Sequence, residues 1–374
     1  MAIFQVIGLR ECLRSIKEAL WVASLLSAFL VFLALNANYI GSSSLPLVQI
    51  FGYVIALTAM PVFFGARSVE LYYRNAEGIL RFAFWIIVVY SFLQKVFGDY
   101  ALVVPGLTAN YQDATTPNFL SEKNNMIWGI GYLKATSTYQ NGNLYGVNLL
   151  LIGFLYISSL RRQFKSFAIA LVAMGLSCIL TASASVYLGF AAGALHLALS
   201  YKGGARAAIL LVIATALVGV PLVAVMLSGD SIIFSILQER ILNRDLTQGG
   251  GRVVKVVGYL DALIEDPLVL FTGMLFYPRV FSEIYEITYL SALQMFGLFV
   301  SMSFGLFVAI KSFMLRKTVY FTPIVAYLVA AVSDGASWLP PTMTNFFLVL
   351  GICHAWKSVD DSRMTHSLKV SARK

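Results

Sequence analysis

Charged residues are scarce in this chain. Only 12% of its 374 residues are Asp, Glu, Lys or Arg, whereas soluble domains carry about 25%. Hydrophobic residues make up 59% of the sequence, and the mean hydropathy is +0.79. The alternating apolar and polar segments of about ten residues that a membrane β-barrel needs are also absent. This composition excludes a soluble globular domain of this size and predicts an all-α membrane protein.

Cysteine and histidine are equally sparse. The chain has three of each: Cys12, Cys178, Cys353, His196, His354 and His366. No CxxC pair occurs, and no cysteine falls in the polar loops that are predicted to lie outside. Both observations argue against a disulfide framework, a redox role or a zinc site. Two histidines lie in apolar segments, where we expect them to be packed or hydrogen-bonded rather than catalytic. The sequence predicts neither a metal nor a cofactor.

Long apolar runs are abundant. A run of about 18 or more apolar residues can cross the ~30 Å hydrocarbon core as a helix. The sequence predicts ten such spans, at about 19–38, 46–64, 81–97, 144–160, 166–182, 184–200, 207–227, 287–310, 318–334 and 342–356. We interpret residues 1–374 as a single polytopic membrane domain.

The basic residues predict the topology of these spans. If the N-terminus is cytoplasmic, nineteen of the 27 Lys and Arg residues fall in the inner segments, and the short outer loops 39–45 and 335–341 have none. This distribution follows the positive-inside rule and places both termini in the cytoplasm. The net charge of +9 therefore reflects membrane topology, with the lipid bilayer as the partner and no nucleic acid.

Two long outer segments remain, at about 98–143 and 228–286. They hold the other eight basic residues, and loops of this length inside a compact protein are uncommon unless they are functional or disordered. The composition of neither is that of a disordered segment. In the second, a basic amphipathic helix over 234–246, with Arg240 and Arg244 one turn apart, is predicted to lie along the membrane interface.

The stretch TQGGGRVVK is the most unusual part of the second loop. Three glycines precede Arg252, and the spacing predicts a helix over 252–266 that Pro267 ends. Its apolar stripe consists of Val253, Val257, Leu260 and Ile264, and a neighbouring polar stripe consists of Arg252, Lys255, Tyr259 and Asp266. Basic residues in the first turn, beside free backbone N–H groups, suit a phosphate. The alternative is a flexible link with basic residues at anionic lipid headgroups.

Other candidate residues are less specific. Glu283 and Glu286 stand one helical turn apart before Tyr289 and can be a general base or a solvated pair at a helix start. The stretch QNGNLYG, with Asn143, predicts a turn and an N-cap that open a helix. Asp334, near the outer end of a span, is either functional or at the interface.

Taken in order, four stretches resemble the bacterial O-antigen polymerase (Wzy) and O-antigen ligase family of integral-membrane glycosyltransferases. They are NGNLYG, LTASASVYLGF at 180–190, GGRVVKVVGYLDALIEDPLVLFTG, and EITYLSALQMFGLFV at the next span. Each stretch is degenerate, and the resemblance rests on their order, their spacing and the large outer loop before the last three spans. It covers most of the chain.

The resemblance implies a metal-independent enzyme of the Gram-negative inner membrane whose active site faces the periplasm. Its substrate would be oligosaccharide linked to undecaprenyl diphosphate, and a flippase and a chain-length regulator are the expected partners. Arg252 would stabilise the diphosphate, and Glu286, or next Glu283, would activate the acceptor hydroxyl. Further substrate-binding candidates are Arg244, Lys255, Tyr259, Arg279, Asn143 and Tyr289.

The sequence departs from the family at two places. Ala184 follows Ser183 where the family often has Arg, and Lys255 or Val256 stands where an aromatic residue commonly follows the Gly-Arg pair. Ligases use a histidine in the large outer loop, and this loop has none, which favours a polymerase that joins lipid-linked repeat units. A ligase remains an alternative, as does a flippase or transporter of lipid-linked oligosaccharide, although no related halves and no charge near mid-span support a transporter.

Overall fold

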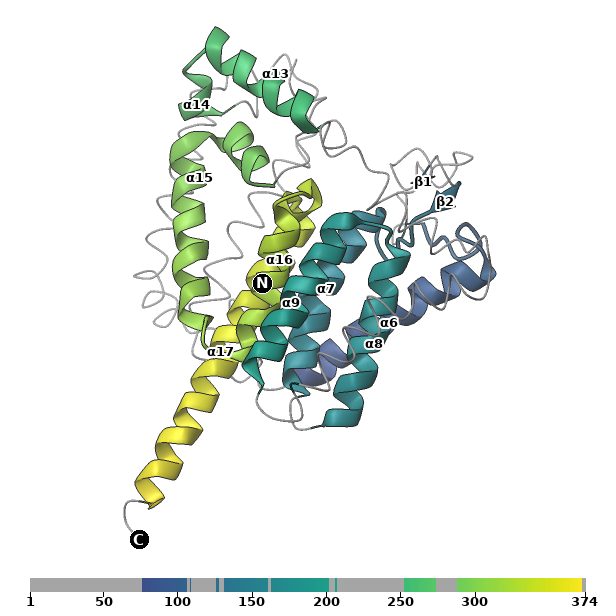
Figure 1. The fold of residues 1–374 in the computed structure, drawn as a ribbon, viewed down its shortest axis with the longest axis vertical. Coiled ribbons are helices and arrows are strands. Elements are labelled where there is room, and N and C mark those ends of the chain that lie inside the picture. The colour runs from purple at the N-terminus through teal and green to yellow at the C-terminus, as the bar shows by residue number, and fades with distance from the viewer. Residues whose placement is uncertain are drawn as a thin grey trace, which may run out of the picture. The chain divides into compact units, whose positions relative to one another are not determined.

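The computed structural model describes residues 76–105, 108, 126–127, 131–160, 163–201, 206, 252–273 and 288–371 (Figure 1). The spans predicted at 19–38, 46–64 and 207–227 lie outside these residues. The described chain is mainly helical, and α6 (Ala76–Phe97), α7 (Gly142–Ser159) and α15 (Thr288–Leu315) are long and apolar enough to cross a membrane. The prediction of a helical chain is therefore confirmed, and three candidate spans are consistent with a membrane protein, whereas the count of ten spans and their topology stay predictions.

The helices divide between two compact units. One contains most of α6, together with α7, α8 (Phe164–Leu180), α9 (Ala184–Ser200) and α16 (Thr322–Ala331), and it ends in the short helix η8 (Gly335–Trp338). We call this unit the bundle. The other contains most of α13 (Arg252–Glu265), α14 (Val269–Thr272), α15, the short helix η7 (Val319–Phe321) and α17 (Pro340–Ser371). We call it the α15 unit.

In the bundle, α7, α8, α9 and α16 lie side by side and alternate in direction (Figure 1). The turn between α8 and α9 contacts residues 132–135, since the Ala135 amide donates to the Leu180 carbonyl at 2.9 Å. At the opposite end, His196 Nδ1 pairs with Thr322 Oγ1 at 2.9 Å. This alternation agrees with the predicted topology, which places the end with the 181–183 turn outside. We refer to it as the head of the bundle.

Glycines bring α9 close to α16. A Cβ at Gly189 would stand 2.7 Å from the Ala326 carbonyl oxygen, and one at Gly193 would stand 2.9 Å from Ala326 Cβ. Lipid tails are as apolar as leucine, so helices in a membrane associate mainly through such close contacts between small residues. Gly189 and Gly193 are four residues apart, and together they form the flat surface on which α16 packs.

In the α15 unit, α15 and α17 run in the same direction. His354 Nε2 pairs with the Lys311 carbonyl at 3.0 Å, and Lys357 Nζ donates to the Met314 carbonyl at 2.7 Å. The helix α17 continues to Ser371, well beyond the predicted span 342–356, and Tyr320 Oη donates to Asp360 Oδ2 at 2.7 Å in this extension. The expectation that His196 and His354 are hydrogen-bonded is confirmed.

One predicted span is interrupted. Residues 287–310 were expected to form one continuous helix, but Gly297 has non-helical torsions (φ 71°, ψ 178°) in the middle of α15. Only glycine adopts this backbone conformation readily. A Cβ at Gly297 would overlap the Phe271 carbonyl, and one at Gly273, also at positive φ, would stand 2.5 Å from the Met295 carbonyl oxygen. The break in α15 is therefore filled by the backbone that ends α14.

The segment 98–143, predicted as an outer loop, contains a short antiparallel hairpin in its described part. Strands β1 (Met126–Ile127) and β2 (Tyr132–Leu133) pair Met126 with Leu133 and Ile127 with Tyr132. Ile127 and Tyr132 pack with Ala182 of the turn between α8 and α9. The hairpin therefore rests on the head of the bundle.

The contact between α9 and α16 predicts the effect of adding one methyl group. Gly189→Ala should lower the stability of the protein by about 1–3 kcal/mol, because the new Cβ must displace the backbone of α16. The thermal unfolding midpoint in detergent measures this effect. Gly305→Ala in α15 is the matched control, since nothing lies within 4 Å of its Cβ position, and it should leave the midpoint unchanged or raise it. Equal midpoints for both variants would contradict this account of the α9–α16 contact.

Candidate functional site

A buried lysine from the preceding segment, Lys134, contacts the first turn of α7. Asn141 is the N-cap, and its Oδ1 accepts from the Asn143 amide at 2.7 Å. Lys134, only 7% exposed, donates from Nζ to Asn143 Oδ1 at 3.2 Å. Gly142 gives the lysine stem room, because a Cβ there would stand 2.7 Å from Lys134 Cβ. An ammonium group and the positive end of a helix dipole therefore coincide, and this arrangement favours an anion at the same place.

A second lysine at the head has a different environment. Lys95, in the last turn of α6, forms an ion pair with Asp99 at 2.7 Å and lies 4.3 Å from the centre of the Tyr132 ring. It also donates to the Leu133 carbonyl. A cation at the C-terminal end of a helix is favoured by the dipole, and this one is neutralised by Asp99. Lys95 is therefore a structural residue that fixes the hairpin to α6.

The side-chain amide of Gln94, on α6, holds the segment that carries Lys134. Gln94 Nε2 donates to Thr136 Oγ1 and to the Ser137 carbonyl, each at 3.3 Å, and Gln94 Oε1 accepts from the Ser137 amide at 2.8 Å. Ser137 Oγ donates to the Ile87 carbonyl at 2.6 Å. These bonds satisfy polar groups that are buried in the bundle and fix the position of Lys134 relative to α7.

Backbone strain is concentrated in the same region. Among the described residues, two that are not glycine have positive φ, namely Ser137 (50°) and Ala182 (47°), and both lie at the head of the bundle. Such residues cost of order 1–3 kcal/mol each and cluster at functional sites. Tyr132 Oη donates to the Leu180 carbonyl at 2.9 Å just before the Ala182 turn. Hydrogen bonds from Ser137 to Gln94 and Ile87 hold the first strained turn, and the bond from Tyr132 to Leu180 holds the chain just before the second.

Asp334 is buried at the head and joins α9 to the start of η8. It is 3% exposed, and its Oδ2 accepts from Ser185 Oγ at 2.7 Å. Its Oδ1 accepts from the Ala336 amide at 2.9 Å, and Ser185 Oγ lies 2.8 Å from Ser183 Oγ. Burial does not fix the depth of Asp334 in a membrane, so both hypotheses for this residue, a functional carboxylate and a place at the interface, stay predictions. The carboxylate fixes the first turn of α9 to the segment after α16.

Burial also sets the protonation of two tyrosines at the head. Burial raises the pKa of Tyr139 to about 12 and raises that of Tyr132 further, with Tyr187 and Asp99 adding to the effect on Tyr132. Both phenols therefore stay protonated across the physiological range. Tyr132 donates its hydrogen bond to the Leu180 carbonyl, and neither phenol is suited to be a general base.

In the α15 unit, the helix predicted after the three glycines is present. It begins at Arg252 and ends at Glu265, two residues before Pro267, as the spacing predicts. Tyr259 is only 2% exposed, whereas Val257, Leu260 and Ile264 of the apolar stripe are exposed. The structure describes the backbone of Arg252 and Lys255 but not their side chains. The helix is thus present as predicted, and the described members of its apolar stripe face outwards.

The structure places the predicted site residues unequally. Asn143 lies beside Lys134 in the first turn of α7, and Tyr289 is about half exposed in the first turn of α15. Four predicted residues lie outside the described part of the chain: Arg244, Arg279, Glu283 and Glu286. Sequence reasoning missed Lys134, although it is one of only a few basic residues on the predicted outer side and stands seven residues before the N-cap.

Comparisons with protein-family models, with curated proteins and with solved structures find no match for this chain.

The bonds to Asp334 predict different effects for two substitutions. Asp334→Ala leaves Ser185 Oγ and the Ala336 amide without this acceptor, which should lower stability by about 1–3 kcal/mol. Asp334→Asn keeps one acceptor oxygen and should cost less. Thermal midpoints of the purified variants measure the order. Ser200→Ala is the control, because its hydroxyl is exposed and donates to His196 within the same helix. Identical midpoints for Asp334→Ala and Ser200→Ala would mean that Asp334 does not tie α9 to η8.

Proposed function

We propose that this protein is an O-antigen polymerase of the bacterial inner membrane, acting at the periplasmic face. It would join oligosaccharide repeat units linked to undecaprenyl diphosphate into a long polysaccharide. The observation that carries the proposal is the buried Lys134, whose ammonium contacts Asn143 in the first turn of α7, on the side that the basic residues predict to be outside. A site for an anion at that level of the membrane is suited to a lipid-linked diphosphate.

The proposed reaction needs no metal and no nucleotide sugar. A hydroxyl oxygen on the non-reducing end of the acceptor repeat forms a bond to the anomeric carbon of the donor chain. The bond from that carbon to the diphosphate oxygen breaks, and its electron pair leaves with undecaprenyl diphosphate. The hydroxyl proton passes to a carboxylate. The protein therefore has to orient two glycans, remove one proton and stabilise negative charge on the leaving diphosphate.

Two helix starts support the stabilisation of that charge. In α7, Lys134 Nζ donates to Asn143 Oδ1 at the N-terminal end of the helix, where the dipole is positive. In α13, Arg252 is the first helical residue directly after Gly249–Gly251, and Lys255 follows in the next turn. We assign diphosphate binding to Arg252, with Lys255, Arg244 and Arg279 as further candidates, and we propose Lys134 as a separate contact for an anion. Arg is suited to this role because its guanidinium can hold two phosphate oxygens at once.

The general base in this proposal is a carboxylate just before α15. Glu286 stands two residues before Thr288, where that helix begins, and Glu283 one turn earlier. We assign the proton to Glu286, with Glu283 as the alternative. The half-exposed Tyr289 and the amide of Asn143 are proposed to contact sugar hydroxyls. Asp334 is a poorer base, because both of its carboxylate oxygens already accept hydrogen bonds.

The break in α15 favours a second candidate, a transporter of lipid-linked oligosaccharide. Discontinuous helices are common in transporters, where they form a site near the middle of the membrane. Here, however, the break is filled by the backbone of Phe271–Gly273. The sequence of α7 and α9 also contains no Asp, Glu, Lys or Arg. The polymerase therefore remains the better supported of the two.

Deletion of the gene in the native bacterium separates these functions, with surface polysaccharide resolved on a gel. Loss of a polymerase should leave lipid A core that carries a single repeat unit, because one repeat can still be ligated. Loss of a ligase or of a flippase should instead leave core without any repeat. A normal ladder of long chains in the deletion strain would contradict all three functions.

Point variants test the two proposed phosphate contacts in the same assay. Arg252→Ala and Lys134→Met should each remove long chains, since loss of one donor to a developing charge costs about 10²–10³ in rate. Lys134→Met keeps the apolar stem beside Gly142. Arg206→Ala and Lys165→Met are the matched controls, because both residues are exposed and lie on the predicted inner side. With all four variants present in the membrane at equal amounts, normal chain length in Arg252→Ala and Lys134→Met would overturn the assignment.

A further inference from the structure

The helix α13 has its apolar face turned outwards. Val257, Leu260 and Ile264 are 49%, 51% and 78% exposed, while Tyr259 on the opposite side is 2% exposed. In water this orientation is unfavourable, because removing an aliphatic side chain from water is favourable. An apolar face that points away from its own protein indicates that something apolar covers it.

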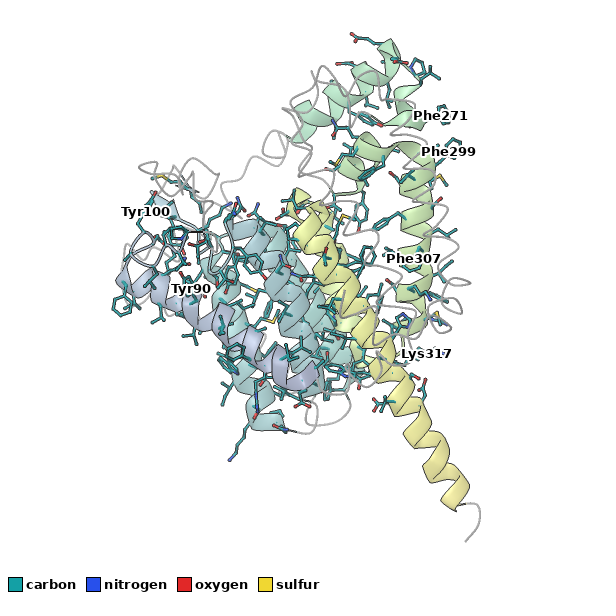
Figure 2. All side chains as sticks on the ribbon, turned by 180° about the vertical axis from the view of Figure 1, so that it is seen from behind. Tyr90, Tyr100, Phe271, Phe299, Phe307 and Lys317 are labelled. Carbon is teal, nitrogen blue, oxygen red and sulfur yellow. The ribbon has the colours of Figure 1, made fainter. Side chains whose placement is uncertain are left out.

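The exposed apolar row of α13 continues onto a membrane-spanning helix. Leu268 and Phe271 extend the row through α14, and both are exposed. The Phe271 and Phe299 rings stack at 5.7 Å between centroids, and Figure 2 shows both rings on the same outer edge of the α15 unit. From Phe299 the exposed stripe runs down α15 at helical spacing through Met302, Leu306, Ile310 and Phe313. The row on α13 is therefore continuous with an exposed apolar stripe along α15, a helix long enough to cross a membrane.

The break at Gly297 joins α14 to α15. Below the break, the part of α15 from Leu298 to Leu315 is about 27 Å long at 1.5 Å per residue, close to the ~30 Å of the hydrocarbon core. Phe299 begins this part, and the carbonyl of Phe271 packs against the break itself. The joint made by Gly273 and Gly297 therefore fixes the end of α14 to one end of a helical segment that is long enough to cross the hydrocarbon core.

We propose that α13 is an interfacial helix that lies along the bilayer surface, with Val257, Leu260 and Ile264 inserted among the lipid acyl chains. Its occupant is lipid, because the same surface continues along a helix of membrane-spanning length. Asp261 and Glu265 are exposed beside the apolar row. Acidic flanks do not attract anionic headgroups, so apolar area drives the insertion and anionic lipid is not required.

This orientation has a consequence for the rest of the helix. Arg252 and Lys255 stand seven and four residues before Tyr259, so the three positions share one face of α13. With the apolar row in the lipid, that face is turned away from the hydrocarbon. The proposal does not depend on the reaction that the protein catalyses, and either can fail without the other.

Spin labels on single cysteines test the proposal in the full chain. The three native cysteines are replaced by serine or alanine, and the protein is placed in nanodiscs of zwitterionic lipid. Labels go to Leu260→Cys and Ile264→Cys in the apolar row and to Asp261→Cys and Glu265→Cys beside it. Phe313→Cys on α15 is the reference for a position that faces lipid. Ser200→Cys, at the exposed end of α9, is the reference for a position that water reaches. Collision rates with oxygen, which enters lipid, and with a water-soluble nickel complex are then measured.

At positions 260 and 264 the oxygen rate should exceed the nickel rate several-fold, as at position 313, and at positions 261 and 265 the order should reverse. High nickel rates at all four positions would place α13 in water and overturn the proposal. Low rates for both reagents at 260 and 264 would mean that protein, such as a second copy of the chain, covers the row, and would overturn it equally. The experiment is then repeated in nanodiscs that contain anionic lipid. If positions 260 and 264 enter the lipid only when anionic lipid is present, apolar area is not what drives the insertion.

A second reporter guards against disturbance by the label. Ile264→Trp should lose most of its fluorescence in lipid brominated along the acyl chain, and Glu265→Trp should lose much less. Because tryptophan suits the membrane interface, this variant should keep the fold even where a spin label does not. Each loss is measured against the same variant in lipid without bromine. Equal losses at the two positions would contradict an orientation with one face in lipid.

Discussion

The structure depends on close packing of helices that gain little from the hydrophobic effect. In a bilayer, separating two apolar helices exposes them to lipid rather than to water, so van der Waals contact must hold them. Gly189 and Gly193 of α9 supply that contact by letting the backbone of α16 approach. This approach brings Ser185, at the start of α9, within hydrogen-bond distance of Asp334 beyond α16. The polar head of the bundle is thus assembled on an apolar contact between glycines and alanine.

Polar groups at the head are then fixed by direct bonds rather than by solvent. Gln94 holds the segment at Thr136 and Ser137, and that segment places Lys134 beside Asn143. A buried ammonium is costly, and in this position it adds to the field of the α7 dipole instead of opposing it. Such an arrangement suits the binding of a negatively charged group, which is the physical basis of the proposed diphosphate role.

Much of the helical framework could be predicted from the sequence, because apolar runs and helix-ending residues are local signals. The bounds 184–200 of α9 agree with the predicted span, and those of α7 differ from it by one or two residues. The start of α13 at Arg252 and its end before Pro267 were also predictable, since both follow from nearby glycines and proline. The extension of α17 to Ser371 was not, because its charged residues resemble a solvated tail.

Features that depend on distant contacts could not be predicted. The break at Gly297 depends on the backbone of Phe271 and Gly273, and an apolar run gives no sign of it. The bond between Ser185 and Asp334 joins residues 149 positions apart. Spacing identified the apolar row of α13, but only packing decides that its described members face outwards. For the same reason Lys134 could be counted among the outer basic residues, while its burial beside Asn143 could not be foreseen.

The most direct test of the central claim is a reaction with purified components. The protein in nanodiscs is given the lipid-linked repeat unit that a strain without this gene accumulates, with a chelator present and no nucleotide sugar. The account predicts a ladder of longer glycans, with one undecaprenyl diphosphate released for each bond formed. A folded, monodisperse protein that leaves every glycan at one repeat and releases no diphosphate carrier would contradict it.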